Sequence, residues 1–399
     1  MVGALQARGV GTRDFGRLTG AWATSLVGDG VRTVALPLYT AISTRSPLAA
    51  SAVAVATALP WLMVALPAGV LVDRWSPRTV VAVAHTFRAV VTGLLAFAVV
   101  ADRANVALLC AFAFLLTSAE TFADTASQVL LVELAGPDDL ERANGRFVTV
   151  ETVGMDLVGP LAASALFWWE PAACFALDAL TFVVAAYLVF RLPEVTPDRP
   201  PRTSLRTQLA EGAGFLVRSS RLRVLVIAVA VTAICASAVN AMFALYAVTV
   251  LGLPPSAVPW LVVVISLGAL AGARISPLVA AKLGPGRVMV GALVVLGAAF
   301  ALYGAVPHLA AALVAVVLFG AASAGWNVLS ATRRQRLTPT PLMGRVTSAY
   351  RVLAWGLSPV GAAIAGPLAA ATSLGVVYLA AGATTVVTAL VLARPLMRT

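Results

Sequence analysis

Long apolar segments follow one another along almost the whole chain, and they constrain the fold more than any single motif. A helix needs about 20 apolar residues to cross a bilayer. The sequence contains twelve such segments, which lie near 17–44, 47–73, 78–101, 104–131, 146–168, 171–191, 223–250, 255–281, 285–306, 308–332, 344–370 and 372–393. As a soluble domain, a chain that is 60% hydrophobic and 11% charged would expose more apolar surface than water tolerates. We therefore predict an all-α integral membrane protein.

The second half of the sequence repeats part of the first. Gly145-Arg146 recurs as Gly344-Arg345, 199 positions later in a chain of 399 residues. Gly159-Pro160 recurs at the same offset as Ser358-Pro359. In both places a basic residue opens an apolar segment and a proline flanked by small residues follows. The repeat indicates that one half of the chain is written twice.

Six spans precede the middle of the chain and six follow it, which agrees with the repeat. We expect a six-helix bundle over 1–192, a second over 223–399, and pseudo-two-fold symmetry between them. Residues 193–222 should link the bundles across the cytoplasmic face. Their alternation of apolar and polar residues favours an amphipathic helix on the inner membrane surface, although a solvated linker fits nearly as well.

The basic residues are distributed unequally between the two ends of the spans. Of the 28 Lys and Arg residues, 22 fall on one side, whereas Arg45 and Arg103 fall on the other. By the positive-inside rule both termini are cytoplasmic, as in a multi-pass protein of a bacterial inner membrane. The net charge of +11 then reflects topology, and nucleic-acid binding is the poorer interpretation.

Six ionisable residues of the first half lie at similar depth within their spans. They are Asp29, Arg32, Arg88, Glu120, Asp124 and Asp156. At about 1.5 Å of rise per residue, each falls roughly 10–23 Å from the cytoplasmic end of its span. Secondary transporters bind substrate near this depth. Such groups are costly, at roughly 2.5–3.5 kcal/mol each on insertion scales, and usually functional.

The spacing of these residues predicts pairs. Asp29 and Arg32 are three residues apart and share a helix face, so they can form an ion pair, which could also serve only to fix the first span. Glu120 and Asp124 share a face of the fourth span, where two carboxylates cannot both ionise cheaply. Four acids against two arginines leave an excess of two negative charges. Protons, a cationic substrate or arginines of the second half must neutralise it.

The second half carries fewer charges at this depth and more aromatic residues. Together with the two arginines of the first half, its polar and aromatic residues are candidates for substrate binding: Arg32, Arg88, Asn240, Trp326, Asn327, Arg351 and Trp355. The two tryptophans could stack against a large, partly apolar substrate, with Arg351 over an aromatic face. Ordinary helix packing is the alternative for each. Arg274 is the remaining arginine within a span.

Several function classes lack the residues they need. Lys282 is the only lysine and no Gly-Lys-Ser/Thr loop exists, so the chain cannot drive transport with ATP by itself. His85 and His308 lie on different spans, and the three cysteines have no Cys-x-x-Cys spacing. We predict no metal, no cofactor and no enzymatic activity.

One loop resembles a known family. Gly69-Val70-Leu71-Val72-Asp73-Arg74-Trp75-Ser76-Pro77-Arg78 resembles the signature loop between the second and third spans of the major facilitator superfamily. Ser76 and Thr79 depart from the family's usual glycine and basic residue. Further segments resemble its enterobactin-exporter and macrolide-efflux branch: Gly28-Asp29-Gly30, Glu141-Arg142-Ala143-Asn144, Gly159-Pro160, Phe175-Ala176-Leu177-Asp178-Ala179 and Leu342-Met343-Gly344-Arg345-Val346.

The resemblance implies a twelve-helix fold and a cytoplasmic gate. In the family the loop acid, here Asp73, meets the start of the eleventh span, where Arg345 stands in this sequence. The gate candidates are Gly69, Asp73, Arg74, Arg78 and Arg345, and the helix-interface candidates are Gly159, Pro160, Ser358 and Pro359. Met155 and Ala163 occupy positions where the exporter signature of the fifth span usually has glycine.

Together these observations predict a monomeric secondary transporter in the lipid bilayer. We expect it to export a hydrophobic or amphipathic small molecule, such as a drug, an antibiotic or a siderophore-like compound. Export should be coupled to protons and proceed by alternating access. Asp29 is the first candidate for the proton carrier and Asp124 the second. Uptake or uniport of a nutrient or siderophore is the alternative, and a membrane sensor or scaffold a remote one. We expect the first half to handle protons and the second half the bulk of the substrate.

Overall fold

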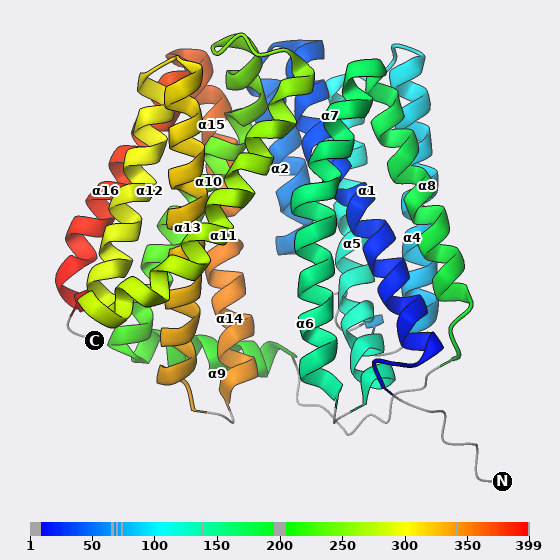
Figure 1. The fold of residues 1–399 in the computed structure, drawn as a ribbon, viewed down its shortest axis with the longest axis horizontal. Coiled ribbons are helices and arrows are strands. Elements are labelled where there is room, and N and C mark those ends of the chain that lie inside the picture. The colour runs from blue at the N-terminus through cyan, green and yellow to red at the C-terminus, as the bar shows by residue number, and fades with distance from the viewer. Residues whose placement is uncertain are drawn as a thin grey trace. The chain divides into compact units, whose positions relative to one another are not determined.

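The computed structural model describes residues 9–64, 68, 71–72, 75–136, 139–194, 205–339 and 342–397, and within that part of the chain it contains helices and no strand (Figure 1). The helices form two compact units. Unit 1 comprises Met1–Leu36 and Leu59–Arg202, and unit 2 comprises Pro37–Ala58 and Thr203–Thr399.

The helices of unit 1 begin with α1, whose 32 residues continue past Leu36 into unit 2. The helices are α1 (Arg13–Thr44), α4 (Pro77–Val100), α5 (Val106–Ala135), α6 (Leu140–Glu151), the π-helix η2 (Thr152–Val158), α7 (Gly159–Trp169) and α8 (Pro171–Phe190). The sequence gives several of them clear starts. Proline occupies the first position of α4 and of α8, where a missing N–H costs nothing, and the Asn105 side chain caps α5 by accepting from the Leu108 N–H at 2.9 Å.

Unit 2 holds the remaining helices. They are α9 (Leu205–Arg218), α10 (Ser220–Thr249), the short 3₁₀ turn η3 (Pro255–Ala257), α11 (Val258–Leu283), α12 (Pro285–Ala305), α13 (Leu309–Leu337), α14 (Met343–Trp355), α15 (Ser358–Ala371) and α16 (Leu374–Met397). The first part of α2 (Pro47–Met63) also belongs here, and the Ser51 hydroxyl of α2 donates a buried hydrogen bond to the Ala362 carbonyl of α15.

Most predicted spans agree with the helices to within a few residues, but α2 ends at Met63 within the span predicted at 47–73, and the span predicted at 344–370 is divided into α14 and α15. Nine helical stretches of the described part are long and apolar enough to cross a membrane, with α2 and α15 as shorter apolar helices. The span predicted at 146–168 corresponds to α6, η2 and α7, which run continuously from Leu140 to Trp169. The predicted all-helical fold is confirmed. A further helix, α9, lies within the segment expected to link the two bundles.

Helix α4 exposes apolar side chains and buries a charged one. Large apolar side chains line one face of α4 at helical spacing and are exposed: Val83, Phe87, Val90, Leu94, Phe97 and Val100. The opposite face buries Arg88, which is 1% exposed. A soluble helix would have the reverse arrangement, so the exposed face of α4 has the composition of a helix in an apolar environment.

The repeated proline distorts the helix in both halves, but differently. Proline lacks an N–H and its ring clashes with the carbonyl four residues earlier. Before Pro160 the chain widens into the π-helix η2, a common response to such a clash. Before Pro359 the helix instead breaks between α14 and α15, at residues 356–357.

Glycines next to these prolines allow close helix contacts. A Cβ on Gly159 would lie 2.6 Å from the carbonyl carbon of Gly30 in α1. A Cβ on Gly361 would lie 2.8 Å from the carbonyl carbon of Ile234 in α10. Both distances are far below van der Waals contact, so each unit brings two backbones together where only glycine fits.

Candidate functional site

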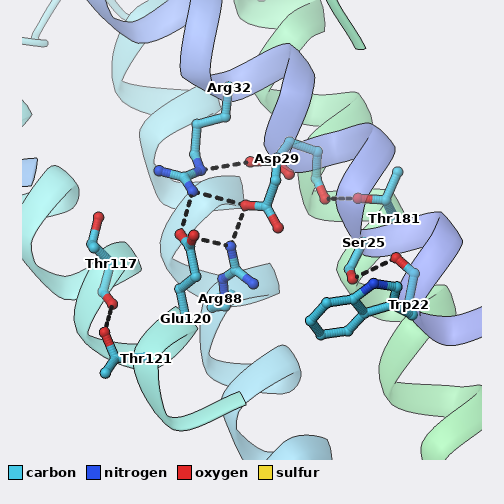
Figure 2. A network of polar contacts seen from close by, with 10 residues as sticks. Trp22, Ser25, Asp29, Arg32, Arg88, Thr117, Glu120, Thr121 and Thr181 are labelled. Carbon is cyan, nitrogen blue, oxygen red and sulfur yellow. Dashed lines mark hydrogen bonds and ion pairs between the residues drawn. The ribbon is translucent and has the colours of Figure 1, made fainter. Parts of the chain in front are cut away.

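Four charged side chains meet in the interior of unit 1. Asp29 and Arg32 come from α1, Arg88 from α4 and Glu120 from α5 (Figure 2). We call these four residues the charged cluster. Arg32 Nη2 lies 2.8 Å from Asp29 Oδ1 and 2.7 Å from Glu120 Oε2. The expected pair between Asp29 and Arg32 is therefore present, and Glu120 extends it to a second helix.

Arg88 completes the cluster from the opposite side. Its Nη2 donates to Asp29 Oδ1 and lies 3.4 Å from Glu120 Oε2. Its guanidinium carbon lies 4.0 Å from the ring centre of Phe182 in α8, and His85 stacks on the same ring at 5.9 Å. The ring's negative face stabilises the cation. Arg88 is thus held by two carboxylates and an aromatic ring.

The charges of the cluster balance, which explains how it can be buried. The side chains of Arg32, Arg88 and Asp29 are 5%, 2% and 6% exposed, and Glu120 is 17% exposed. Isolated charges at this depth would cost several kcal/mol each. Two arginines against two carboxylates leave no net charge, and every ion shares hydrogen bonds with a partner. Removing one member would leave an uncompensated buried charge on the others.

A fifth charged residue, Asp178 of α8, lies next to the cluster and was missed as a site residue. Its side chain is fully buried, and its Oδ2 lies 3.6 Å from Arg32 Nε. Neither carboxyl oxygen has a hydrogen-bond partner among the described residues. The signal was available, because Asp178 falls roughly 20 Å from the cytoplasmic end of the sixth predicted span.

The two other predicted acids lie outside the cluster. Asp124 is half-buried, one turn along α5 from Glu120, within electrostatic reach of Glu120 and Arg88. Asp156 lies on η2 and is exposed. The structure therefore brings together four of the six ionisable residues expected to form a layer, and it adds Asp178.

The interior of unit 2 is aromatic instead. Tyr246, Tyr303 and Tyr378, which we call the tyrosine cluster, come from α10, α12 and α16, with ring centres 4.9 to 5.0 Å apart. Phe243 stacks on Tyr303 at 5.8 Å. A small cavity adjoins them and is lined in part by Asn240, one of the predicted substrate residues.

The remaining substrate candidates of unit 2 are in varied positions. Trp326 is buried in the hydrophobic core with Leu329, which is a packing environment. Asn327 and Arg274 are exposed. The side chains of Arg351 and Trp355 lie outside the described residues.

Only part of the predicted gate can be placed, since Gly69, Asp73 and Arg74 lie outside the described residues. In unit 1, Arg78 donates to the Phe190 carbonyl at 2.6 Å and lies 3.8 Å from Glu194. In unit 2, Arg345 of α14 pairs with Glu211 of α9.

The four helix-interface candidates lie at the starts of two helices. Gly159 and Pro160 are buried at the start of α7, and Ser358 and Pro359 begin α15. Among the described residues, no three His, Cys, Asp or Glu side chains are arranged to hold a metal ion.

Comparison with known proteins identifies the family of the chain. Residues 21–363 match the family model described as Major Facilitator Superfamily. Several relatives carry the name multidrug efflux pump Tap, and two of them illustrate the similarity. The one from Mycobacterium tuberculosis (strain ATCC 25618 / H37Rv) is 31% identical over 386 residues, which cover 92% of this chain and 90% of the relative. The one from Mycolicibacterium fortuitum is 28% identical, covering 90% and 89%.

Solved structures of low sequence identity share the fold. The crystal structure of nucleoside transporter NupG has a TM-score of 0.78 at 15% identity, covering 96% of this chain and 99% of that one. A bacterial homologue of iron transporter ferroportin, in an inward-facing state, has a TM-score of 0.73 at 16% identity, covering 96% and 98%.

Proposed function

The chain belongs to the major facilitator superfamily and is a multi-pass inner-membrane transporter rather than an enzyme, and from that premise we propose that it exports hydrophobic or amphipathic small molecules, drugs among them, in exchange for protons by alternating access. The relatives named multidrug efflux pumps match almost its whole length, which supports drug-like substrates. The charged cluster supports the coupling and carries the proposal.

The number of acidic groups in the interior of unit 1 supports coupling to protons. The charged cluster is neutral by itself, but Asp124 and Asp178 lie beside it. Two further negative charges at this depth would be costly, so protons or a cationic substrate must compensate them for part of the transport cycle. Asp29 and Glu120 both contact the two arginines, but the 3.4 Å contact between Glu120 and Arg88 is the longest of the four, so a proton on Asp29 would loosen the cluster more than a proton on Glu120. We therefore keep Asp29 as the first candidate and Asp124 as the second.

The substrate contacts we propose follow from which groups remain available. Arg32 and Arg88 are engaged by carboxylates, so they would meet an anionic substrate only after the cluster rearranges. Asn240 beside the aromatic cavity and the exposed Asn327 are the better first contacts. An aromatic, partly apolar compound carrying a positive charge suits this combination.

We propose cytoplasmic termini, on the distribution of basic residues, and a monomer as the working unit. Arg78 and Arg345, together with Gly69, Asp73 and Arg74, would form the cytoplasmic gate.

Inverted membrane vesicles test the function directly. We expect vesicles containing the protein to accumulate the fluorescent cation ethidium when their interior is acidified, and to lose most of that accumulation when a protonophore removes the pH gradient. Neutral variants at the four acids (Asp29→Asn, Glu120→Gln, Asp124→Asn and Asp156→Asn) should include at least one that binds ethidium but no longer responds to the gradient. Unchanged coupling in all four would contradict the proposal.

The same assay separates the alternatives. A protein that takes up nutrients would move its substrate out of inverted vesicles along the imposed gradient. A sensor or scaffold would move nothing in either direction while still reaching the membrane. Accumulation that persists without a pH gradient would indicate a different driving force.

A further inference from the structure

Asp178 is the buried ionisable group that the charged cluster leaves unused. Its carboxyl is fully buried, yet neither oxygen accepts a hydrogen bond from a described residue. An ionised carboxylate in that condition is costly because nothing replaces its lost water. The Asp178 carboxyl is therefore a buried hydrogen-bond acceptor that is still available to a donor.

The donor that faces Asp178 is also unsatisfied. Arg32 Nε lies 3.6 Å from Asp178 Oδ2, within ion-pair range but beyond hydrogen-bond distance, and this Nε–H has no partner among the described residues. The other end of the same guanidinium is engaged, since Nη2 holds both Asp29 and Glu120. Arg32 thus binds two carboxylates at one end and faces a third at the other.

The backbone keeps this third carboxylate close. A Cβ on Gly28 would collide with the Asp178 carboxyl and would lie 3.2 Å from the Asp178 Cα. On α8, the Thr181 hydroxyl donates back to the Asp178 carbonyl at 2.7 Å, which satisfies the backbone and leaves the carboxyl free. The contact between α1 and α8 at Gly28 therefore fixes the distance between Arg32 and Asp178.

The second arginine has no such freedom. Arg88 is clamped by Asp29, Glu120 and the Phe182 ring. Of these two arginines, only Arg32 faces an additional acceptor at ion-pair distance among the described residues. The charged and titratable groups within electrostatic reach of Asp178 are Asp29 and Arg32 of α1, Arg88 of α4, Glu120 of α5 and Cys174 of α8.

We propose that Asp178 is the second acceptor of Arg32, the carboxylate to which Arg32 turns when Asp29 takes up a proton. The inference rests on the proposed proton coupling for its role in transport. A proton that binds the Asp29 carboxylate removes one negative charge, so Arg32 gives up its hydrogen bond to Asp29 Oδ1 and donates to Asp178 Oδ2 instead. When Asp29 releases the proton, Arg32 returns. Arg32 keeps its contact with Glu120 of α5 in both states, and in the protonated state α1 gains a hydrogen bond to α8.

A double-mutant cycle on thermal stability tests the exchange without any proton gradient. Asp29→Asn imitates protonated Asp29, so Arg32 should then depend on Asp178. We expect Asp178→Asn to leave the Tm of the purified protein within about 2 °C of wild type or to raise it, whereas in the Asp29→Asn background the same change should lower Tm by at least about 2 °C more. The matched control Asp102→Asn, in an exposed loop, should behave alike in both backgrounds.

Two results would overturn the proposal. One is an equal effect of Asp178→Asn in both backgrounds, which would mean that Arg32 does not change partner. The other is a large loss in the wild-type background, since it would make Asp178 a standing structural partner. Asp178→Ser repeats the cycle with a smaller neutral side chain. If only the double variant fails to fold, that failure is itself the expected coupling.

Transport supplies the functional arm. In inverted vesicles Asp178→Asn should keep gradient-independent ethidium exchange and reduce stimulation by a pH gradient at least about fivefold. A wild-type protein that ignores the gradient would refute proton coupling while leaving the thermal cycle to decide the exchange. A coupled wild type with an unaffected Asp178→Asn variant would refute the role of Asp178 alone.

Discussion

The interiors of the two units differ in chemistry although their helices correspond. The charged cluster and Asp178 draw on the first, third, fourth and sixth spans of the first half, α1, α4, α5 and α8. The tyrosine cluster draws on the first, third and sixth spans of the second half, α10, α12 and α16. Equivalent helices thus surround ions in one unit and rings in the other.

This difference shows how a repeated scaffold can take two tasks. Ion pairs at this depth are interdependent, because each charge needs its partner. Aromatic rings stabilise through apolar burial and through tilted or offset contacts, so the loss of one ring leaves no unpaired charge behind. A unit with interdependent charges suits a switch, whereas a unit with rings suits contact with varied apolar molecules.

The largest expected effect comes from removing one arginine of the charged cluster. Arg88→Ala leaves Asp29 and Glu120 with a single arginine, so we expect a loss of about 3–5 kcal/mol in stability, seen as failure to yield a monodisperse protein on size exclusion. Arg274→Ala, at an exposed arginine of unit 2, is the control and should purify as wild type. A stable, monodisperse Arg88→Ala protein would show that the cluster does not need its balance.

The next largest effect is expected for the loss of a ring from the tyrosine cluster. The Tyr303 hydroxyl has no hydrogen-bond partner among the described residues, so Tyr303→Phe should change stability by less than about 0.5 kcal/mol. Tyr303→Ala removes the ring and should cost about 3 kcal/mol. Thermal unfolding of both variants gives the comparison. Similar losses for the two would mean that unit 2 depends on polar contacts after all.

How far the sequence predicted this difference depends on the range of the interactions involved. Span positions followed from apolar length, and the pair of Asp29 and Arg32 followed from helical spacing, since both are local. The partnership of Arg32 with Glu120, 88 positions away, depends on how α1 packs against α5, and no local pattern encodes it.

The tyrosine cluster escaped prediction for the same reason. Tyr246, Tyr303 and Tyr378 are separated by more than fifty residues each, and each alone resembles an ordinary packing residue. Trp326 and Trp355 are predicted as substrate contacts because tryptophan offers a large aromatic face. The side chain of Trp326 is instead in the core, where its bulk fills space between helices.

A smaller effect should be common to both units. Gly159→Ala and Gly361→Ala each place a methyl group against a neighbouring backbone, and overpacking of this kind costs about 1–3 kcal/mol. We expect matched losses of Tm in the two variants. Gly93→Ala in α4, where a Cβ would meet nothing within 4 Å, should be neutral or gain up to about 1 kcal/mol from helix propensity. Loss in only one half would show that the scaffold is not equivalent.

The smallest effect concerns a charge pair without burial. Glu211 and Arg345 of unit 2 form the same kind of pair as the charged cluster, but their side chains are 47% and 37% exposed. Water already solvates both ions, so their coupling in a double-mutant cycle with alanine should not exceed about 0.5 kcal/mol and should fall further in high salt. A coupling as large as that of the buried cluster would mean that contact geometry, rather than burial, makes the charges of unit 1 interdependent. A negligible coupling would mean that burial makes the charges of unit 1 interdependent. Burial would then also be the reason why unit 1 can respond to a single proton.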